Sequence, residues 1–350
     1  MSMYASGEHG VPHGEHVAKP NAKTLPDWEG ARLFLEVVRR GSFRAAADNL
    51  GSSVNALRRR ISEFEQTLGV VLMTRHVDGV RLTTEGEQVH AAAARMESAS
   101  FDLVRARDRV DSSLEGEVRL ALTEGLGTFW VAPKLVDFQR ANPRLLLDVN
   151  CAMRSADVLR LEADIAVQLT RPSAKNLKIV KLGRLHLLPF VAKSYVETYG
   201  APKNLIELIN HRIVVQSDEQ PLWQDLYERL FPGLPPKAVV TLRTNASSAH
   251  LWSIAQGAGI GMLPTYIHAM GAGVVPLDIG IHVPLDIWLT YHVDAAKIPR
   301  VRRLIDWLAE SFSPRKYPWF RDELIAPEEL AKSYKGQPLM NLFSGFMGAD

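Results

Sequence analysis

The chain has 350 residues, of which 46% are hydrophobic and 23% are charged, so we expect two or three compact units that each bury a core. No apolar run approaches the roughly 20 residues of a membrane-spanning helix, which argues against a membrane protein. The formal net charge of +2 does not by itself indicate a nucleic-acid-binding protein, although a local basic cluster can still attract phosphates. The single cysteine, Cys151, excludes an intramolecular disulfide framework and is typical of a reducing cytoplasm, and we expect its thiol to be buried.

The first 25 residues are polar and contain no apolar block, so we expect a disordered leader rather than a secretory signal, and a cytoplasmic protein. The segment Trp28–Arg40 then carries an apolar stripe that includes Leu33, Phe34 and Val37. This spacing predicts a helix that closes a small core.

The stretch Gly41–Gly69 has the pattern of two helices joined by a polar turn at Gly51-Ser52. Apolar residues recur at helical spacing on both halves, and Ser52 or Ser53 is placed to cap the second helix. Three consecutive arginines, residues 58–60, follow in the second helix; alone they are compatible with a merely solvated face. Within this pattern they indicate a helix-turn-helix, which points to DNA.

Residues 70–82 form two short extended runs around Asp78-Gly79, a strong hairpin signal. A hairpin directly after the second helix predicts a wing, with Arg75 and Arg81 available for phosphates. The predicted DNA-binding residues share an outward or turn position on these elements. They are Ser42, Arg44, Ser52, Ser53, Val54, Asn55, Arg58, Arg59, Ser62, Arg75 and Arg81.

No proline interrupts residues 84–114, which predicts a helix of about 31 residues, roughly 46 Å long. Thr84 and Glu87 have the spacing of a capping box at its start. A heptad seam runs along it, impure at Ser100 and Arg107. The seam either buries against its own domain or, the interpretation we favour, pairs with a second copy of the chain. The seam residues are Val89, Ala93, Met96, Ser100, Leu103, Arg107, Val110 and Leu114.

From Glu115 onward, short apolar strands alternate with amphipathic helices, which predicts an α/β unit with a largely parallel sheet. We expect two lobes with a cleft between them, lobe I at 116–190 and 283–313 and lobe II at 191–282. The predicted strands are 118–122, 145–149, 165–169, 177–182, 187–191, 212–215, 238–242, 260–263 and 284–292. The predicted helices are 128–140, 204–209, 223–230, 247–256 and 301–312, with a loop at 125–127.

With these pieces in order, the chain resembles the LysR-type transcriptional regulators from about Trp28 to Phe312. The resemblance is strongest in the first domain, where many residues fall at the family's spacing. They are Gly41-Ser42-Phe43, Ala46-Ala47, Leu50, Ser53–Ile61, Leu68-Gly69 and Leu82-Thr83 before Gly86. Weaker landmarks follow at Phe138–Pro143, Asp164–Ala166 and Gly257–Gly261 before Pro264.

The resemblance implies an α+β multidomain protein that binds double-stranded promoter DNA under the control of a small-molecule effector. Its parts would be a winged helix-turn-helix at 26–83, a dimerising linker helix at 84–115 and, at 116–313, a two-lobed α/β effector domain resembling type 2 periplasmic binding proteins. Such proteins form homodimers and commonly homotetramers. Residues 314–350 extend beyond the family's usual end, and their apolar content predicts packing on their own domain or on a neighbouring subunit.

The recognition helix departs from the family pattern at two positions. Val54 stands where a glutamine is common, and Arg58 replaces a serine, whereas Arg59 holds the usual arginine. Val54 is suited to a thymine methyl group, and Arg58 to guanine or to phosphate. DNA binding is therefore expected, but with a changed base preference.

In this family the effector usually sits between the lobes. A helix start after Thr123 would offer free amides to an anion, so a carboxylate effector is one option. Glu124 would oppose an anion there, so either Glu124 points away or the ligand is not anionic. The candidate effector-binding residues lie at strand ends that we expect to line the cleft. They are Thr123, Gly125, Thr128, Gln168, Thr170, Gln216, Thr244 and Asn245.

Enzymatic motifs are missing from the sequence: there is no Gly-x-Ser-x-Gly elbow, no P-loop and no metal-ligand spacing. Gly257–Gly261 follows a predicted helix and precedes a strand, so we interpret it as a helix end and turn rather than a dinucleotide fingerprint. We expect no cofactor, no metal and no enzyme. The alternative is a small-molecule binding protein of the periplasmic type without a DNA function, for which residues 28–114 would have no use.

Overall fold

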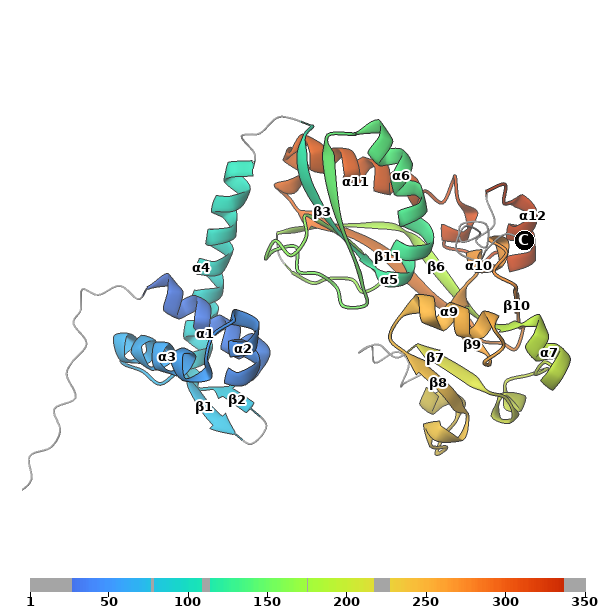
Figure 1. Cartoon of the computed structure of the whole chain (residues 1–350), viewed down its shortest axis with the longest axis horizontal. Coiled ribbons are helices and arrows are strands. Elements are labelled where there is room, and N and C mark those ends of the chain that lie inside the picture. Colours follow the sequence, from blue (N-terminus) through green and yellow to red (C-terminus); the bar gives the residue numbers. More distant parts are fainter. Residues whose placement is uncertain (1–26, 77–78, 109–113, 175, 217–226, 337–350) are drawn as a thin grey trace, which may run out of the picture. The chain divides into compact units, whose positions relative to one another are not determined.

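The computed structural model describes residues 27–76, 79–108, 114–174, 176–216 and 227–336 (Figure 1). One compact unit ends at Leu103 and a second begins at Val104. The predicted leader, the first half of the helix expected at 223–230 and the end of the C-terminal extension lie outside the described residues, as do residues 77–78 and 109–113, whereas residues 227–230 are helical as predicted. None of the described helices is both long and apolar enough to cross a membrane.

The first unit contains the three predicted helices and the predicted hairpin. They are α1 (Trp28–Arg40), α2 (Phe43–Leu50), α3 (Val54–Leu68), β1 (Met73–His76) and β2 (Gly79–Leu82), the two strands being antiparallel. Asp27, Ser42 and Ser53 each cap a helix by accepting a backbone N–H bond. Phe34, Leu57 and other apolar residues bury one stripe of each helix in a shared core.

A buried carboxylate joins α1 to the rest of this unit. Glu36 accepts hydrogen bonds from Arg40 and Arg39, and Asn49 of α2 donates to the same carboxylate at 2.9 Å. Arg39 also pairs with Glu97 at 3.0 Å. Burial alone would raise the pKa of Glu36, but the two guanidinium groups hold it below its ordinary value. These hydrogen bonds give the buried Glu36 carboxylate the partners that a buried charge needs.

Helix α4 (Thr84–Asp108) follows the hairpin. Its cap is Thr83, not the predicted Thr84: the Thr83 hydroxyl accepts from Gly86 N at 2.9 Å and donates to Val71 O at 2.7 Å. The cap is one residue earlier than predicted because Thr83 directly follows the hairpin. At this position its hydroxyl bonds both to the start of α4 and to the segment before the hairpin. We call the helices α1–α3 and the β1–β2 hairpin the head. Along the predicted seam of α4, Ala93 is buried in the core of the head, whereas Met96 and Leu103 are 40% and 75% exposed.

The second unit is built on one seven-stranded sheet in the order β10-β6-β11-β5-β3-β4, with β9 also paired to β6. Its strands are β3 (Gly116–Thr123), β4 (Leu145–Ala152), β5 (Ile165–Gln168), β6 (Leu177–Ala192), β9 (Gly261–Pro264), β10 (Val274–Pro276) and β11 (Val283–His292). Only β3 with β4 and β3 with β5 are parallel. The predicted largely parallel sheet is therefore wrong, because the long strands β6 and β11 pair antiparallel along their length.

The prediction of two strands at 177–182 and 187–191 is also wrong, since β6 runs through both without a break. Gly183 lies in β6, between the two predicted strands. In the structure a β-carbon at Gly183 would lie 2.7 Å from the carbonyl oxygen of Phe320, so the glycine permits close approach of another segment. The register with β11 shifts at this point: Ile287 pairs with Gly183 and Trp288 with Lys181, so β6 carries one extra residue, a bulge.

Lobe II adds a small parallel sheet and short helices. Its elements are α7 (Lys193–Tyr199), the 3₁₀ turns at Ile206–Asn210 and Pro236–Ala238, β7 (Ile213–Gln216), β8 (Val240–Thr244), α9 (Ser247–Ala255) and α10 (Tyr266–Ala269). β7 pairs with β8. An isolated β-bridge between Ile213 of β7 and Ile260, the residue before β9, connects this small sheet to the main one. A separate core that includes Tyr195 and Val215 fills this lobe.

The predicted loop at Gly125–Gly127 is wrong, because the chain is helical directly after β3. It passes through α5 (Glu124–Leu126), a π-helical turn (Gly127–Val131) and α6 (Ala132–Ala141) without a break. A β-carbon at Gly127 would lie 2.3 Å from the Cys151 sulfur, so this glycine serves packing rather than a turn. Cys151 itself is exposed, which contradicts the expected buried thiol; it lies on β4 at the edge of the sheet.

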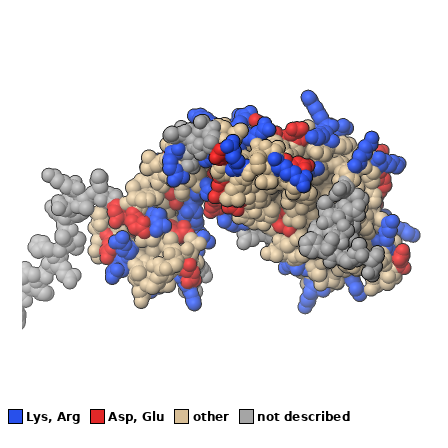
Figure 2. Space-filling view, turned by 45° about the horizontal axis from the view of Figure 1, so that its top comes forward, with Lys and Arg blue, Asp and Glu red and all other residues tan. Residues whose placement is uncertain are grey.

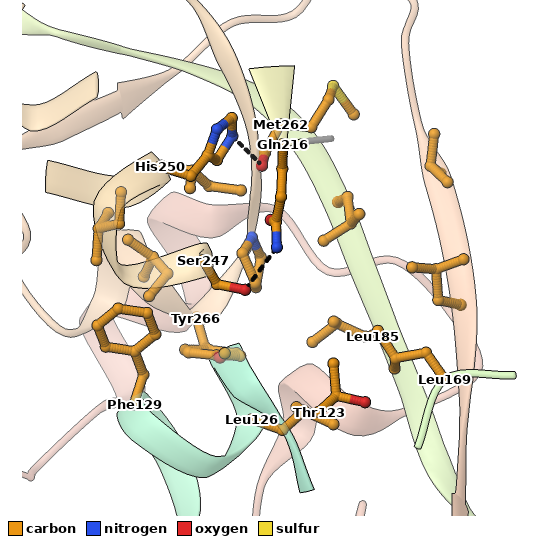
Figure 3. A pocket seen from close by; sticks show the side chains of 18 of the residues that line it. Thr123, Leu126, Phe129, Leu169, Leu185, Gln216, Ser247, His250, Met262 and Tyr266 are labelled. Carbon is orange, nitrogen blue, oxygen red and sulfur yellow. Dashed lines mark hydrogen bonds between the residues drawn. The ribbon is translucent and has the colours of Figure 1, made fainter. Parts of the chain in front are cut away.

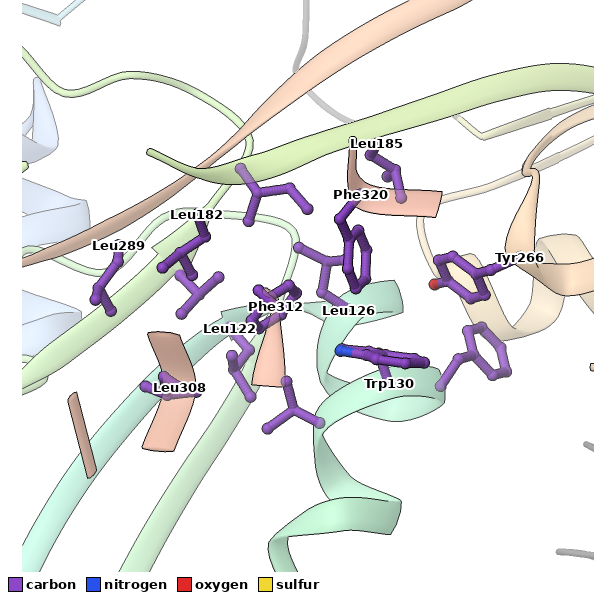
Figure 4. Close-up of a cluster of buried hydrophobic side chains, with 14 of the residues drawn as sticks. Leu122, Leu126, Trp130, Leu182, Leu185, Tyr266, Leu289, Leu308, Phe312 and Phe320 are labelled. Atoms are coloured by element: carbon purple, nitrogen blue, oxygen red, sulfur yellow. The ribbon is translucent and has the colours of Figure 1, made fainter. Parts of the chain in front are cut away.

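The chain closes with a 3₁₀ turn (Ala295–Lys297), α11 (Pro299–Ser311) and the described part of the extension, residues 314–336. The extension forms a 3₁₀ turn (Pro318–Phe320) and α12 (Pro327–Ser333). Phe320 is buried against Trp130, with ring centroids 5.1 Å apart (Figure 4). Trp319 is also buried, and its ring centroid lies 5.3 Å from that of Trp130. The described part of the extension thus packs on its own domain, the first of the two alternatives.

Candidate functional site

Helix α3 divides into a buried face and an exposed face. Leu57 and Ile61 point into the core of the head. The opposite side carries Asn55, Arg58, Arg59 and Ser62, all exposed, which we call the DNA-reading face. These side chains are hydrogen-bond donors one helical turn apart, the arrangement that a recognition helix needs in a major groove.

The structure brings four predicted DNA-binding residues together beside the wing. Ser42, Arg44, Val54 and Arg58 line one groove with His76, Gly79 and Val80 of the hairpin. The Arg58 guanidinium lies over the Phe43 ring, 5.7 Å from its centroid, which orients the arginine at the rim of this groove. Sequence reasoning missed His76, whose position follows only from the register of the hairpin.

The remaining predicted residues occupy different positions. Ser42 and Ser53 use their oxygens to accept the cap bonds from Ala45 N and Ala56 N, both at 3.1 Å. Their hydroxyl hydrogens stay available to an acceptor. Ser52 is exposed in the turn, and Arg81 is exposed on β2. Arg75 lies on β1, but its side chain is outside the described structure.

Charge does not single out a region of the surface that Figure 2 shows. In Figure 2 basic and acidic side chains are interspersed over the surface in view. On the recognition helix, Arg59 and Arg60 each lie within 4 Å of Glu63, at 3.7 and 3.6 Å. Such exposed ion pairs are weak, so they leave both guanidinium groups free to bind phosphate. The charge distribution in this view therefore does not identify a DNA-binding surface, and the predicted one rests on the local arginines.

A cavity of about 160 Å³ lies between the two lobes of the second unit (Figure 3). Lobe I contributes residues of β3, α5 and the following π-turn; lobe II contributes residues of β7, α9, β9 and α10. The crossing strands β6 and β11 add Leu185, Leu187, Val283 and Leu285. We call this space the interlobe cavity. Most of its wall is apolar.

Three polar groups interrupt this apolar wall on its lobe II side and at the end of β3. The Gln216 side-chain amide donates to the Ser247 hydroxyl at 2.8 Å (Figure 3). The same amide nitrogen lies 3.3 Å from the Met153 sulfur. Thr123 contributes a further, largely buried hydroxyl. The predicted residues Thr123, Gly125 and Gln216 therefore lie together at the cavity.

A fourth polar side chain in the wall is that of His250, one turn after Ser247 on α9. It is 2% exposed, and its Nε2 lies 3.2 Å from the Met262 carbonyl oxygen, to which it donates. Its Nδ1 is buried and has no hydrogen-bond partner among the described residues. Burial lowers the pKa of His250 to about 4, so the ring is neutral near pH 7 and Nδ1 is an acceptor.

This burial predicts a loss of stability in acid. The unfolded chain binds a proton on His250 near pH 6.5, whereas the folded chain does so only near pH 4. The free energy of unfolding therefore decreases as the pH falls between these values. We expect a cost of about 2 kcal/mol from this residue between pH 7.5 and pH 5. Urea unfolding of the wild type and of His250→Gln at both pH values measures it. An equal pH dependence in the two proteins would contradict the prediction.

Glu124 bridges the lobes beside the cavity. Its carboxylate, at the start of α5, accepts hydrogen bonds from Ser247 N at 2.6 Å and from Ser248 N at 3.3 Å. These are the first two amides of α9, and Ala246 at the cap position has no side chain to serve them. Glu124 therefore does not point away, which was one of the two sequence alternatives.

The other predicted effector-binding residues lie outside the lining of the interlobe cavity. Thr128 donates from its hydroxyl to Glu124 at 3.4 Å, and Gln168 donates to Thr170 O at 2.6 Å. Thr244 accepts from Ala246 N at 3.2 Å in the turn before α9, and Asn245 is exposed. Gln168 instead lines a smaller hollow between β3, β4 and β5.

Sequence reasoning missed Met153, Ser247, His250 and Tyr266, which also line the interlobe cavity. Ser247 and His250 sit one turn apart on α9, a spacing that is visible in the sequence once the helix start is known. The described residues contain no group of three His, Cys, Asp or Glu side chains that could hold a metal ion.

Comparison with known proteins places both parts of the chain. Residues 28–87 match the family model "Bacterial regulatory helix-turn-helix protein, lysR family", and residues 111–313 match "LysR substrate binding domain". The HTH-type transcriptional regulator DmlR of Escherichia coli K12 is 26% identical over 302 residues, 85% of this chain and 97% of DmlR. An HTH-type transcriptional regulator of Xanthomonas campestris pv. campestris is 32% identical over 186 residues, but the match spans about half of each chain, 53% and 54%.

Among solved structures, ArgP from Mycobacterium tuberculosis aligns with 83% of this chain and 98% of its own, at a TM-score of 0.50 and 20% identity. That likeness supports the fold: a helix-turn-helix head, a long helix and an α/β domain. The relatives are transcriptional regulators rather than enzymes. The two family models together cover most of the described chain, and it belongs to the LysR family of DNA-binding transcriptional regulators, with an effector-binding domain.

Proposed function

We propose that this regulator binds double-stranded promoter DNA as a homodimer, with the DNA-reading face in the major groove, and that a small molecule in the interlobe cavity alters this binding. The observation that carries the proposal is the presence, in the same chain, of an exposed arginine-bearing recognition helix and a largely apolar cavity lined by both lobes. A protein that works on promoters acts where the chromosome lies, so we place it in the cytoplasm.

Helix α4 supports the homodimer. The first half of its seam packs on the head, but Met96 and Leu103 stay exposed at the seam positions of the second half. Large apolar side chains at heptad spacing on an exposed helix favour a partner helix of the same kind. A second copy of α4 supplies that surface. The association of two dimers into a tetramer stays a prediction from the family.

The cavity supports control by a ligand because both lobes contribute to its wall. A molecule that contacts both lobes stabilises one arrangement of them over others. In a dimer, such a change repositions the two heads on DNA. Whether transcription rises or falls depends on the promoter.

The function is tested by a gel shift with the full chain and duplex DNA from upstream of the neighbouring genes, at moderate salt. We expect a retarded complex that survives competition by unrelated duplex. The absence of any complex formed by folded protein, with or without candidate ligands, would overturn the proposal. Salt is held constant because phosphate contacts make affinity strongly salt-dependent.

Two arginines of the DNA-reading face are expected to act differently. Arg59→Ala should weaken binding to all sequences to a similar degree, because phosphate contacts carry no base information. Arg58→Ala, beside the groove, should also change base preference, by about 1–3 kcal/mol at the affected position. Selection from a randomised duplex library measures both effects. Gln66→Ala, an exposed substitution near the other end of α3, is the control, and two arginine variants that bind like the wild type would show that the exposed face is misassigned.

A further inference from the structure

We infer that the effector is a neutral, mainly apolar molecule about the size of one aromatic ring, and that Glu124 excludes small carboxylates by occupying the seat they would take. This inference rests on the proposed role of the interlobe cavity as the effector site. It resolves the choice that the sequence left open between a Glu124 that points away and a ligand that is not anionic.

The seat is the beginning of α9. A helix of nine residues presents unpaired amides and a positive dipole end at its first turn, which is the usual place for a ligand carboxylate. Ser247, the first residue of α9, also lines the interlobe cavity. An anion in the cavity would therefore be drawn to this point if nothing else filled it.

The chain fills the seat with its own carboxylate. Glu124 accepts the Ser247 and Ser248 amides, and its other contact is the Thr128 hydroxyl. The approach is close: a β-carbon on the adjacent Gly125 would lie 2.9 Å from the Ser247 hydroxyl oxygen. Glycine at 125 therefore permits the distance at which Glu124 reaches across to the other lobe.

The rest of the wall offers no compensation for a second negative charge. None of the described residues that line the cavity is a lysine, an arginine or an acid. His250 cannot act as a cation, because burial lowers its pKa to about 4. A carboxylate inside would lose its hydration beside Glu124 with no opposite charge to pair with, which is strongly unfavourable.

The size and polarity of the cavity fit a small neutral ligand. Its volume is about 160 Å³, and an apolar protein cavity of roughly 150 Å³ holds a molecule such as benzene. The Gln216 amide and the Ser247 hydroxyl give a ligand one polar edge. The preferred effector therefore combines an apolar ring or chain with a single uncharged polar group.

Benzamide and benzoate test this directly, because they share a shape and differ in charge. Binding to the full chain is measured by isothermal titration calorimetry and by the shift in melting temperature. We expect the wild type to bind benzamide more tightly than benzoate by about tenfold or more, the factor that corresponds to 1.4 kcal/mol. Equal or tighter binding of benzoate overturns the inference, as does failure of both probes to bind.

Variants assign the discrimination to Glu124. Glu124→Ala empties the α9 seat and should raise benzoate affinity by about tenfold while changing benzamide affinity little. Glu124→Gln removes the charge but keeps an oxygen that can accept from Ser247 N. This variant serves if the alanine variant does not fold. A gain in benzoate binding is again expected. Glu117→Ala, which removes an exposed acid on the preceding strand β3, is the matched control. Unchanged benzoate binding in both Glu124 variants overturns the inference.

The gel shift with upstream DNA separates this inference from the proposed function. A chain that binds its operator but prefers benzoate is a regulator with a different class of effector. A chain that binds benzamide but no DNA contradicts the proposed function and leaves the ligand assignment standing.

Discussion

Phe320→Ala is expected to lower the free energy of unfolding of the effector domain by about 3–5 kcal/mol, the usual cost of removing a fully buried aromatic ring. Phe320 is 0% exposed and lies 5.1 Å from both the Trp130 and Phe312 ring centroids. It also contacts Tyr266 of α10, at 6.2 Å, and so joins the extension to a wall of the interlobe cavity. Figure 4 shows the ring between Trp130, Phe312 and Tyr266.

Urea unfolding followed by tryptophan fluorescence measures this effect, since Trp130 and Trp319 lie in the same cluster. The control is Arg315→Ala, an exposed residue of the same extension, which should change stability by less than about 0.5 kcal/mol. If Phe320→Ala costs no more than the control, the extension does not contribute to the folded core.

Gly86→Ala is expected to destabilise the DNA-binding head by about 3 kcal/mol, the upper end of the usual cost of overpacking, and to abolish operator binding. A β-carbon at Gly86 would lie 1.9 Å from the Leu72 carbonyl oxygen. That oxygen already accepts from Thr83 N at 3.0 Å, where the wing meets the start of α4. The obstacle is backbone, so the wing or the helix must move.

The readout combines thermal unfolding with the gel shift, while binding of benzamide reports whether the effector domain remains folded. Gln88→Ala, an exposed substitution in the same helical turn, is the control and should leave both readouts unchanged. Wild-type stability in Gly86→Ala would show that the close approach of α4 to Leu72 is not a constraint of the fold.

The head was predictable from sequence because its signals are local. The helical spacing of Leu57, Ile61 and Phe64, the cap at Ser53 and the glycine at 69 all act within one or two turns. The apolar stripes of the three helices then pack together in one shared core. The same local logic missed the Thr83 cap by one residue, because the competing partner, Val71 O, lies on the preceding segment.

The cavity was predictable only in part, because its wall is assembled by long-range pairings. Thr123, Gly125 and Gln216 follow from their positions at strand ends, but Tyr266 and Leu185 reach the site only through the path of β6 and β9. The continuous strand β6 was predicted as two strands, and the sequence does not show that Phe320 packs on Gly183 within it. The role of Glu124 depends on its contact with residues more than 100 positions away.

The central claim is that the DNA-reading face binds operator DNA through phosphates and bases. Its most direct test is the affinity of the full chain for its upstream duplex, measured by fluorescence anisotropy between about 50 and 200 mM salt. We predict a linear fall of log K with log salt, with a slope of several units that decreases by about two in Arg59→Ala, one phosphate contact for each subunit of the dimer. An affinity that is independent of salt, or no greater than that for a shuffled duplex, would contradict the account.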